Sequence, residues 1–253
     1  MTPLPRKSLS QHYLQDKNIA RKIVEALQAK EAEQIIEVGP GPGILSHLLA
    51  ERYGERLTVV EIDSNSAAQL REKLPAMREK IIEADFLKFP LPATNHPETA
   101  IIGNFPYHIT SPIFFRVLEH REAITEVVAM IQKEVAERLV CRPGNKTYGL
   151  LSVLLQTFYD VRYLFTVSEK VFYPRPRVKS AVIRLERNDR KELPCPPDSY
   201  FTLVKKAFNQ RRKTLRNALK ELLPGTFDHE LLSRRAEQLS TEDFIRLCHL
   251  LSP

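Results

Sequence analysis

The hydrophobic positions of the chain fall into two kinds of pattern that follow each other in turn. Short apolar runs of strand length appear as QIIEV, RLTVVEID, KIIEADF, TAIIGN, EVVAMIQ, YDVRYLFTV and SAVIRLER. Between them, apolar residues recur at helical spacing, for example over residues 16–30, over residues 64–74 before Pro75, and from Ser111 onward. Strands that alternate with helices predict an α/β fold with a mostly parallel, doubly wound sheet.

The last quarter of the chain has a different pattern. The segment NDRKELPCPPDSY is polar and holds three prolines, which is typical of a linker. Beyond it only helical patterns occur, with apolar pairs four residues apart such as Val204 and Phe208. We therefore expect a larger domain over residues 1–187 and a small all-helical domain over residues 188–253.

Composition narrows the class of protein. Of the 253 residues, 43% are hydrophobic and 27% are charged, as in ordinary globular proteins. No stretch approaches the roughly 18 unbroken apolar residues of a membrane span, and the N-terminal residues lack the apolar core of a secretory signal. We expect a cytoplasmic protein that does not bind membranes.

Cysteines and histidines give no sign of a disulfide framework or a metal site. Cys141, Cys195 and Cys248 are far apart and show no CxxC spacing, and the seven histidines form no HxxxH pair. We expect free thiols and no metal.

Positive charge is concentrated near the C-terminus. The net charge is +7, and seven Lys or Arg residues lie between Lys205 and Lys220 without one acid among them. A run as one-sided as this favours an anionic partner, in particular a nucleic acid.

A glycine-rich turn follows the first apolar run, as Gly39-Pro40-Gly41-Pro42-Gly43. Glycines between a strand and a helix let the backbone pass close to a ligand at the helix N-terminus. The spacing G-x-G-x-G differs from the G-x-G-x-x-G of nicotinamide-binding turns. Glu37 just before the turn would repel a pyrophosphate but could pair with an ammonium. The turn therefore suits the amino acid part of S-adenosylmethionine better than a dinucleotide.

Acids end the next two predicted strands. Glu61 and Asp63 follow the second strand, where an acid can bond ribose hydroxyls, and Asp85 follows the third, where a carboxylate can accept from an adenine amino group. Because the carboxyl ends of parallel strands meet at one edge, these acids are expected to face the same crevice. Together they predict a nucleoside-type cofactor.

The fourth strand ends in Asn104-Phe105-Pro106-Tyr107 at the same edge. An exocyclic amine on a base is a poor nucleophile because its lone pair is delocalised into the ring. The Asn104 side-chain oxygen and the Phe105 carbonyl, held by the restricted backbone before Pro106, could accept from its N–H groups and favour a pyramidal nitrogen. Tyr107 offers a face on which the base can stack.

With these companions, the tetrapeptide resembles that of the adenine-N6 methyltransferases that act on ribosomal RNA. Further stretches are similar to the small-subunit rRNA adenine dimethyltransferases, the KsgA/RsmA family, over nearly the whole chain. They are LSQHYL (9–14), IQKEVAERL (131–139), YGLLSV (148–153), VFYPRPRVKSAVIRL (171–185) and FNQRRKTLRNAL (208–219).

This resemblance implies a Rossmann-like class I methyltransferase sheet over residues 1–187 and an RNA-binding helical domain over 188–253. It implies N6,N6-dimethylation of two adjacent adenosines in the 3′-terminal hairpin of 16S rRNA, within the 30S subunit or its precursor, during late assembly. S-adenosylmethionine would be the methyl donor. We expect a monomer.

The same resemblance assigns roles to individual residues. The implied cofactor contacts are His12, Leu14, Gly39, Glu61, Asp85 and Asn104, to which the turn itself adds Glu37 and Gly41. Phe172 would stack on the side of the target adenine opposite Tyr107. On the predicted helix that buries Phe208 and Leu215, basic side chains would point outward to phosphates. The expected RNA contacts are Arg175, Arg177, Lys179, Arg211, Arg212, Lys213 and Arg216.

The chain departs from the family pattern at a few positions. Ser10 replaces a glycine, His12 an asparagine and Tyr13 a phenylalanine, which puts the His12 contact in doubt. Phe105 replaces the commoner leucine, where only the backbone carbonyl is needed. His108 stands where asparagine is more usual and has no assigned role.

Rival interpretations share parts of this pattern. The methyltransferases of large-subunit (23S) rRNA share the tetrapeptide and the glycine turn, but FNQRRKTLRNAL argues against them. DNA adenine methyltransferases favour Asp/Asn-Pro-Pro-Tyr/Phe, which is absent. A non-catalytic ribosome assembly factor would not need Glu61, Asp85 and Asn104 together.

Overall fold

The computed structural model describes residues 11–30, 32–92, 98–190 and 192–252. The chain forms two compact units, each built from two segments. The first comprises Met1–Ala136 and Val161–Arg187, and the second comprises Glu137–Asp160 and Asn188–Pro253. The expected boundary after residue 187 coincides with one limit of the second unit, whose other segment lies inside the domain expected over residues 1–187.

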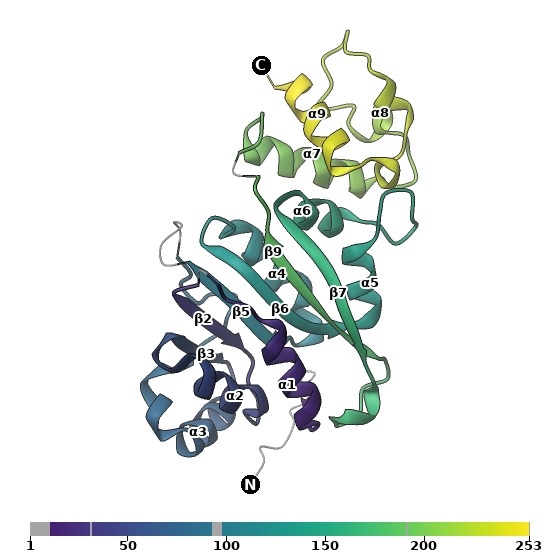
Figure 1. Ribbon diagram of the computed structural model, residues 1–253. Coiled ribbons are helices and arrows are strands. Elements are labelled where there is room, and N and C mark those ends of the chain that lie inside the picture. The colour runs from purple at the N-terminus through teal and green to yellow at the C-terminus, as the bar shows by residue number, and fades with distance from the viewer. Residues whose placement is uncertain (1–10, 31, 93–97, 191, 253) are drawn as a thin grey trace. The chain divides into compact units, whose positions relative to one another are not determined.

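A seven-stranded sheet in the order β4-β3-β2-β5-β6-β9-β7 carries the first unit (Figure 1). Neighbouring strands from β4 to β6 are parallel, while β9 runs antiparallel to β6. The strands are β2 (Gln34–Val38), β3 (Leu57–Glu61), β4 (Ile81–Glu83), β5 (Thr99–Asn104), β6 (Ile124–Gln132), β7 (Tyr159–Val167) and β9 (Ser180–Arg187). The predicted α/β class with a mostly parallel, doubly wound sheet is confirmed.

Strand order explains where a ligand can bind. The chain moves outward from β2 to β3 and β4, and then returns to the other side of β2 with β5 and β6. The order therefore reverses between β2 and β5, and open α/β sheets bind ligands at the carboxyl ends of the strands at such a point. The glycine turn follows β2 and the Asn104 tetrapeptide ends β5, so this topology brings them together.

Helices cover both faces of this sheet. On one face, α1 (Lys17–Ala26) packs against α2 (Ile44–Tyr53) and β6, and α3 (Ser64–Lys73) packs against β3 and β4 (Figure 1). Alternate strand residues such as Ile35, Val59 and Ile102 form one apolar core with them. On the opposite face α4 (Thr110–Glu119) buries Phe114, whose ring lies 5.9 Å from that of Phe105. Helix α5 (Lys133–Val140) follows β6.

Two short strands form a separate antiparallel pair, β1 (Tyr13–Leu14) with β8 (Phe172–Tyr173). Tyr13 pairs with Tyr173 and Leu14 with Phe172. The pair ties the N-terminal segment to the segment that precedes β9, although more than 150 residues separate them in the sequence.

The second unit consists mainly of helices and short 3-10 turns, together with the first two residues of β7, and its described residues beyond 187 form no strand, as the sequence predicts. The helices lying wholly in it are α6 (Leu150–Phe158), α7 (Pro197–Asn209), α8 (Leu215–Ala218) and α9 (Thr241–Leu251). Tyr200 of α7 lies within hydrogen-bond distance of Thr157 of α6, at 2.7 Å between the two hydroxyls.

The expectation of one helix through FNQRRKTLRNAL is wrong. Helix α7 ends at Asn209 and α8 begins at Leu215, with a turn between them. Thr214 is extended and forms an isolated antiparallel bridge with Arg235, and the Leu215 N–H donates to the Arg234 carbonyl at 2.7 Å. Pairing with a distant segment therefore interrupts a helix that local periodicity favours.

No helix within the described ranges is long and apolar enough to cross a membrane.

Candidate active site

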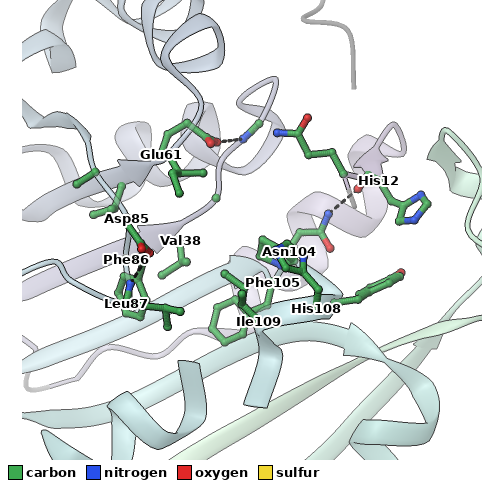
Figure 2. A pocket seen from close by; sticks show the side chains of 18 of the residues that line it. His12, Val38, Glu61, Asp85, Phe86, Leu87, Asn104, Phe105, His108 and Ile109 are labelled. Carbon is green, nitrogen blue, oxygen red and sulfur yellow. Dashed lines mark hydrogen bonds between the residues drawn. The ribbon is translucent and has the colours of Figure 1, made fainter. Parts of the chain in front are cut away.

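A pocket opens at the carboxyl edge of the sheet, at the reversal point between β2 and β5 (Figure 2). It encloses about 900 Å³, its open mouth included. Nine of the predicted site residues line it, namely His12, Gly39, Gly41, Glu61, Asp85, Asn104, Phe105, Pro106 and Tyr107. Leu14, Glu37 and Phe172 are not among its lining residues.

The glycine turn passes close beneath the N-terminal segment. Gly41 has a φ of +52°, and a Cβ atom built on it would lie 2.8 Å from Cε1 of Tyr13. Both the backbone conformation and the space at this position therefore require glycine. The Gly41 N–H donates to the Glu61 carboxylate at 3.1 Å, which joins the turn after β2 to the end of β3.

Glu61 is buried, with 3% of its surface exposed, and each carboxylate oxygen accepts a backbone hydrogen bond. Oε2 accepts from Gly41, and Oε1 accepts from the Asp63 N–H at 2.9 Å. Burial raises the pKa of Glu61, while the two hydrogen bonds oppose that rise. Its carboxylate is thus held in one orientation at the pocket wall.

Asp63, the other acid expected at this strand end, does not line the pocket. It is the N-cap of α3, where its Oδ2 accepts from the Ser66 N–H at 2.9 Å and from the Ser66 hydroxyl at 2.7 Å. Its role here is to cap a helix.

Asp85 follows β4 at the opposite side of the pocket from His12 (Figure 2). Its Oδ1 accepts from the Leu87 N–H at 2.9 Å. Phe86 and Ile62 line the same pocket, and Ile62 is 54% exposed although it is a large apolar residue. Apolar side chains beside a fixed carboxylate are suited to a flat heterocycle that carries an amino group.

Asn104 ends β5 and points into the pocket (Figure 2). Its side-chain N–H donates to the His12 carbonyl at 2.9 Å, so the amide nitrogen faces the N-terminal segment and the oxygen can accept from a ligand. Phe105 is buried, and its N–H donates to the Met130 carbonyl at 3.0 Å. The backbone of the tetrapeptide is therefore anchored to β6.

Pro106 and Tyr107 complete this rigid turn. The Pro106 carbonyl accepts from the Ile109 N–H at 3.1 Å and from the Thr110 hydroxyl at 3.2 Å. The Tyr107 hydroxyl lies 2.7 Å from the Ser180 hydroxyl, and burial raises its pKa. Its ring lies 5.4 Å from that of His12 at an interplanar angle of 32°. Two rings thus stand at the pocket mouth.

Glu37 is a buried acid next to the glycine turn. It is 1% exposed, and neither carboxylate oxygen has a hydrogen-bond partner among the described residues. Burial raises the pKa of Glu37 to about 8, against a smaller lowering by the neighbouring Ser46 hydroxyl, which lies outside hydrogen-bond geometry. Burial thus favours the protonated form of this carboxyl, which lies behind the glycine turn.

Leu14 and Phe172 lie in the apolar core rather than at the pocket. Leu14 is 3% and Phe172 5% exposed, and both belong to the cluster that packs against α1 and the sheet. Stacking of Phe172 on a base would require its ring to leave this position.

Several lining residues were not singled out as ligand contacts from the sequence, among them Gln11, Tyr13, Ile62, Phe86 and Leu87. Most adjoin a predicted site residue. They could have been identified by their position next to a predicted site residue, because sequence neighbours at a strand end can reach the same crevice. Ser10 lies outside the described residues.

The expected RNA contacts differ in their surroundings. In the first unit Arg175, Arg177 and Lys179 are exposed, and Arg175 forms an ion pair with Glu169. In the second unit Arg212 and Lys213 are exposed.

Arg211 already has partners within the second unit. It is half-buried, donates to the Lys146 carbonyl and lies 3.8 Å from Glu237. Arg216 is exposed but forms an ion pair with Asp228. Acids from outside the run therefore neutralise part of its charge.

Clusters of three or more His, Cys, Asp or Glu side chains that could hold a metal ion do not occur in the part of the chain that the structure describes.

Comparison with known proteins gives a consistent picture. A protein of *Porphyromonas gingivalis* named ribosomal RNA small subunit methyltransferase A is 50% identical over 97% of both chains. One of the same name from *Cytophaga hutchinsonii* is 48% identical over 98% of this chain and 97% of its own.

Solved structures agree on the fold. A dimethyladenosine transferase from *Plasmodium falciparum* superposes with a TM-score of 0.77 at 24% identity, over 93% of this chain and 96% of its own. The 23S rRNA methyltransferase ErmE superposes with a TM-score of 0.67 at 26% identity, over 93% of this chain and 99% of its own. A family model described as ribosomal RNA adenine dimethylase matches residues 4–252. With that match and these relatives, the chain belongs to the ribosomal RNA adenine dimethylase family.

Proposed function

We propose that this enzyme dimethylates N6 of two adjacent adenosines in the 3′-terminal hairpin of 16S rRNA within the small ribosomal subunit or its precursor, with S-adenosylmethionine as methyl donor. The observation that carries the proposal is the Asn104–Tyr107 turn. It stands at the mouth of a pocket with two carboxylates, and Asn104 is oriented by its bond to the His12 carbonyl. Relatives about 50% identical, named as small-subunit methyltransferases, support the choice of RNA.

The residues present fit the proposed cofactor. Glu61 and Asp85 both line the pocket and offer fixed acceptors for ribose hydroxyls and an adenine amino group. Ile62 and Phe86 offer apolar surface for the purine ring. When bound, the cofactor supplies a methyl group on a sulfonium, an excellent leaving group. The pairing of its ammonium with Glu37 remains part of the proposal and would require that carboxyl to ionise.

The chain's own residues would activate the target amine by holding it. The Asn104 oxygen and the Phe105 carbonyl accept from its two N–H groups and direct the nitrogen lone pair toward the methyl group. Tyr107 would stack on the base, and its hydroxyl contact with Ser180 keeps the ring in place. A strong general base is unnecessary, because water or Asn104 can relay the proton to solvent after transfer.

Substrate choice would depend mainly on the shape of the folded RNA. A paired adenine must be extruded before it reaches Asn104, at a cost of a few kcal/mol. Exposed Arg177, Lys179, Arg212 and Lys213 would contact phosphates and position the enzyme without reading sequence. A ribosomal substrate would place the enzyme in the cytoplasm, and no partner subunit is needed for the proposed chemistry.

The test is transfer of labelled methyl groups from S-adenosylmethionine to unmethylated 30S particles, beside 50S particles and duplex DNA. The proposal expects label in 30S alone, recovered as N6,N6-dimethyladenosine, and no transfer by Asn104→Ala. Binding of 30S without any transfer by the wild-type protein would make it a non-catalytic assembly factor.

A second candidate is methylation of 23S rRNA. The likeness to ErmE favours it, at 26% identity over nearly the whole chain. The small-subunit relatives are about twice as similar in sequence. Label in the 50S arm of the same experiment would decide for this candidate.

A further inference from the structure

An exposed segment borders the pocket mouth, and its function is not accounted for by the fold. We call residues 172–179, Phe172 to Lys179, the pocket arm. At its start, Nδ1 of His12 lies 2.7 Å from the Pro174 carbonyl. Just beyond its end, the Ser180 hydroxyl lies 2.7 Å from that of Tyr107. Because His12 and Tyr107 both line the pocket, the two ends of the arm lie beside lining residues.

Backbone contacts hold the arm in this position. Tyr173 pairs with Tyr13 in the β1–β8 ladder, and the Lys133 N–H donates to the Lys179 carbonyl at 2.9 Å. Tyr13 lines the pocket, so Tyr173 is the strand neighbour of a lining residue. Side chains of the arm that face solvent are therefore presented from a fixed backbone.

Two neighbouring aromatic residues of the arm have opposite surroundings. Phe172 is 5% exposed and packs in the core, whereas Tyr173 is 61% exposed. A tyrosine ring left in water contributes little to folding, because the hydrophobic gain comes from surface removed from solvent. The exposed ring of Tyr173 is thus available to a ligand, while that of Phe172 is covered.

The charged residues around Tyr173 indicate the class of ligand that its ring could bind. Arg175, Arg177 and Lys179 are all exposed on the same arm. Arg175 is paired with Glu169, but no ion pair is recorded for Arg177 among the residues described. An exposed aromatic ring beside unneutralised cations is the combination that binds unpaired nucleotides, with the ring stacking on a base and the cations contacting phosphates. Tyr173 and Val178 are the arm's exposed large apolar residues, too small an apolar area for a stable protein interface.

We propose that Tyr173 stacks on an unpaired base next to the target adenine, while Arg177 binds the adjoining phosphate. The inference rests on the proposed function, since it assumes an RNA substrate. It assigns Tyr173 to substrate binding at the rim, apart from the chemistry at Asn104. The base would lie outside the pocket, on the side where His12 meets Pro174.

Steady-state methyl transfer to unmethylated 30S particles tests the proposal with Tyr173→Leu, Tyr173→Phe and the control Tyr163→Leu. Tyr163 lies on β7, does not line the pocket and bonds to Thr166 of the same strand. One lost base stack is worth about 1–3 kcal/mol, so KM for the particles should rise roughly 5- to 150-fold in Tyr173→Leu. The kcat and the KM for S-adenosylmethionine should stay unchanged, and Tyr173→Phe and Tyr163→Leu should match the wild type.

A fluorescent base gives a second readout. RNA hairpins carrying 2-aminopurine at single positions beside the target adenines should show quenching at one flanking position with wild type and Tyr173→Phe, and none there with Tyr173→Leu. Arg177→Gln should lower the slope of log affinity against log salt by about 1.

Outcomes for this inference and for the proposed function are distinct. Equal KM and equal quenching in Tyr173→Leu and wild type, with wild-type transfer intact, would overturn the role of Tyr173 alone. A rise in KM for 30S particles without loss of quenching on the hairpin would assign Tyr173 to a ribosomal protein instead. Absence of transfer by the wild type would overturn the proposed function itself.

Discussion

The carboxyl edge of the sheet and the basic run from Lys205 to Lys220 both gather polar side chains, but in opposite ways. Glu61, Asp85 and Asn104 are more than 40 residues apart from first to last, yet they line one pocket. The basic residues lie within 16 positions, yet Arg211 and Arg216 face the acids Glu237 and Asp228 rather than a common surface.

This difference shows which sequence patterns predict neighbours in the folded protein. Parallel strands end at one edge whatever their separation in sequence, so acids at strand ends meet as soon as the topology is known. No such rule holds for a run of basic residues, because acids from distant segments can form ion pairs with them in the folded protein. Only Arg212 and Lys213 of the predicted RNA contacts in this run are exposed without a recorded ion pair among the described residues.

Substitution at the pocket mouth should have the largest effect. Asn104→Ala removes an acceptor aimed at the target amine, and kcat should fall by roughly 10²–10³-fold, as when one donor is removed from an oxyanion hole. It also removes the bond to the His12 carbonyl, so cofactor affinity should fall only modestly. Single-turnover methyl transfer and calorimetric binding separate the two effects. Asn65→Ala, at an exposed position of α3, is the control, and a kcat within threefold of wild type would exclude the role of Asn104.

Glu61, which ends β3, and Asp63, which caps α3, offer a matched pair for the next prediction. Glu61→Gln places an amide N–H against one of the two backbone N–H donors, so the dissociation constant for S-adenosylmethionine should rise by about 10- to 100-fold. Asp63→Asn weakens a helix cap, which should lower stability by up to about 1 kcal/mol and leave that constant unchanged. Calorimetry and thermal unfolding of both variants check this, and equal losses of affinity would contradict it.

Glu37 should make the stability of the protein depend on pH. Its folded pKa of about 8 lies above the ordinary value of 4.5. As pH rises from 4.5 to 8 the unfolded chain loses this proton and the folded chain keeps it, so stability should fall by roughly 1.4 kcal/mol per pH unit and then level off. Glu37→Gln should remove this slope and be the more stable protein at pH 8, measured by urea unfolding at pH 5.5 and 8.

The same variant tests the proposed ammonium contact. If Glu37 must ionise to pair with the cofactor, wild-type affinity for S-adenosylmethionine should rise with pH up to about 8, and that of Glu37→Gln should not. Parallel profiles for the two proteins would exclude the contact.

Substitutions in the basic run should have the smallest effects. These effects should differ between exposed and half-buried residues. Arg212→Gln should weaken RNA binding about three- to tenfold and reduce the salt slope by about 1, because it loses one phosphate contact. Arg211→Gln should lower the melting temperature instead, because it removes the bond to the Lys146 carbonyl and the charge near Glu237. RNA titrations at several salt concentrations and thermal unfolding compare them, and a reversed pattern would show that Arg211 turns outward to bind RNA.

Sequence alone predicted much of the first unit. Strand and helix periodicity, together with the alternation of the two, were enough for the α/β class, the seven strands of the sheet and the place of Asp85 and Asn104 at one edge. The stop of α3 before Pro75 followed from local chemistry as well. These features depend on residues close in sequence or on general rules of parallel sheets. They could therefore be predicted without knowing which distant segments pack together.

Tertiary structure alone decided which of two neighbouring residues lines the pocket or is exposed. Asp63 caps a helix while Glu61 lines the pocket, and Phe172 is buried while Tyr173 is exposed. The break between α7 and α8 comes from pairing of Thr214 with Arg235. Asp63 is occupied by the local cap of α3, whereas the burial of Phe172 and the break after α7 come from segments distant in the chain. Burial and pairing are properties of the packed structure, whereas periodicity is a property of the local chain.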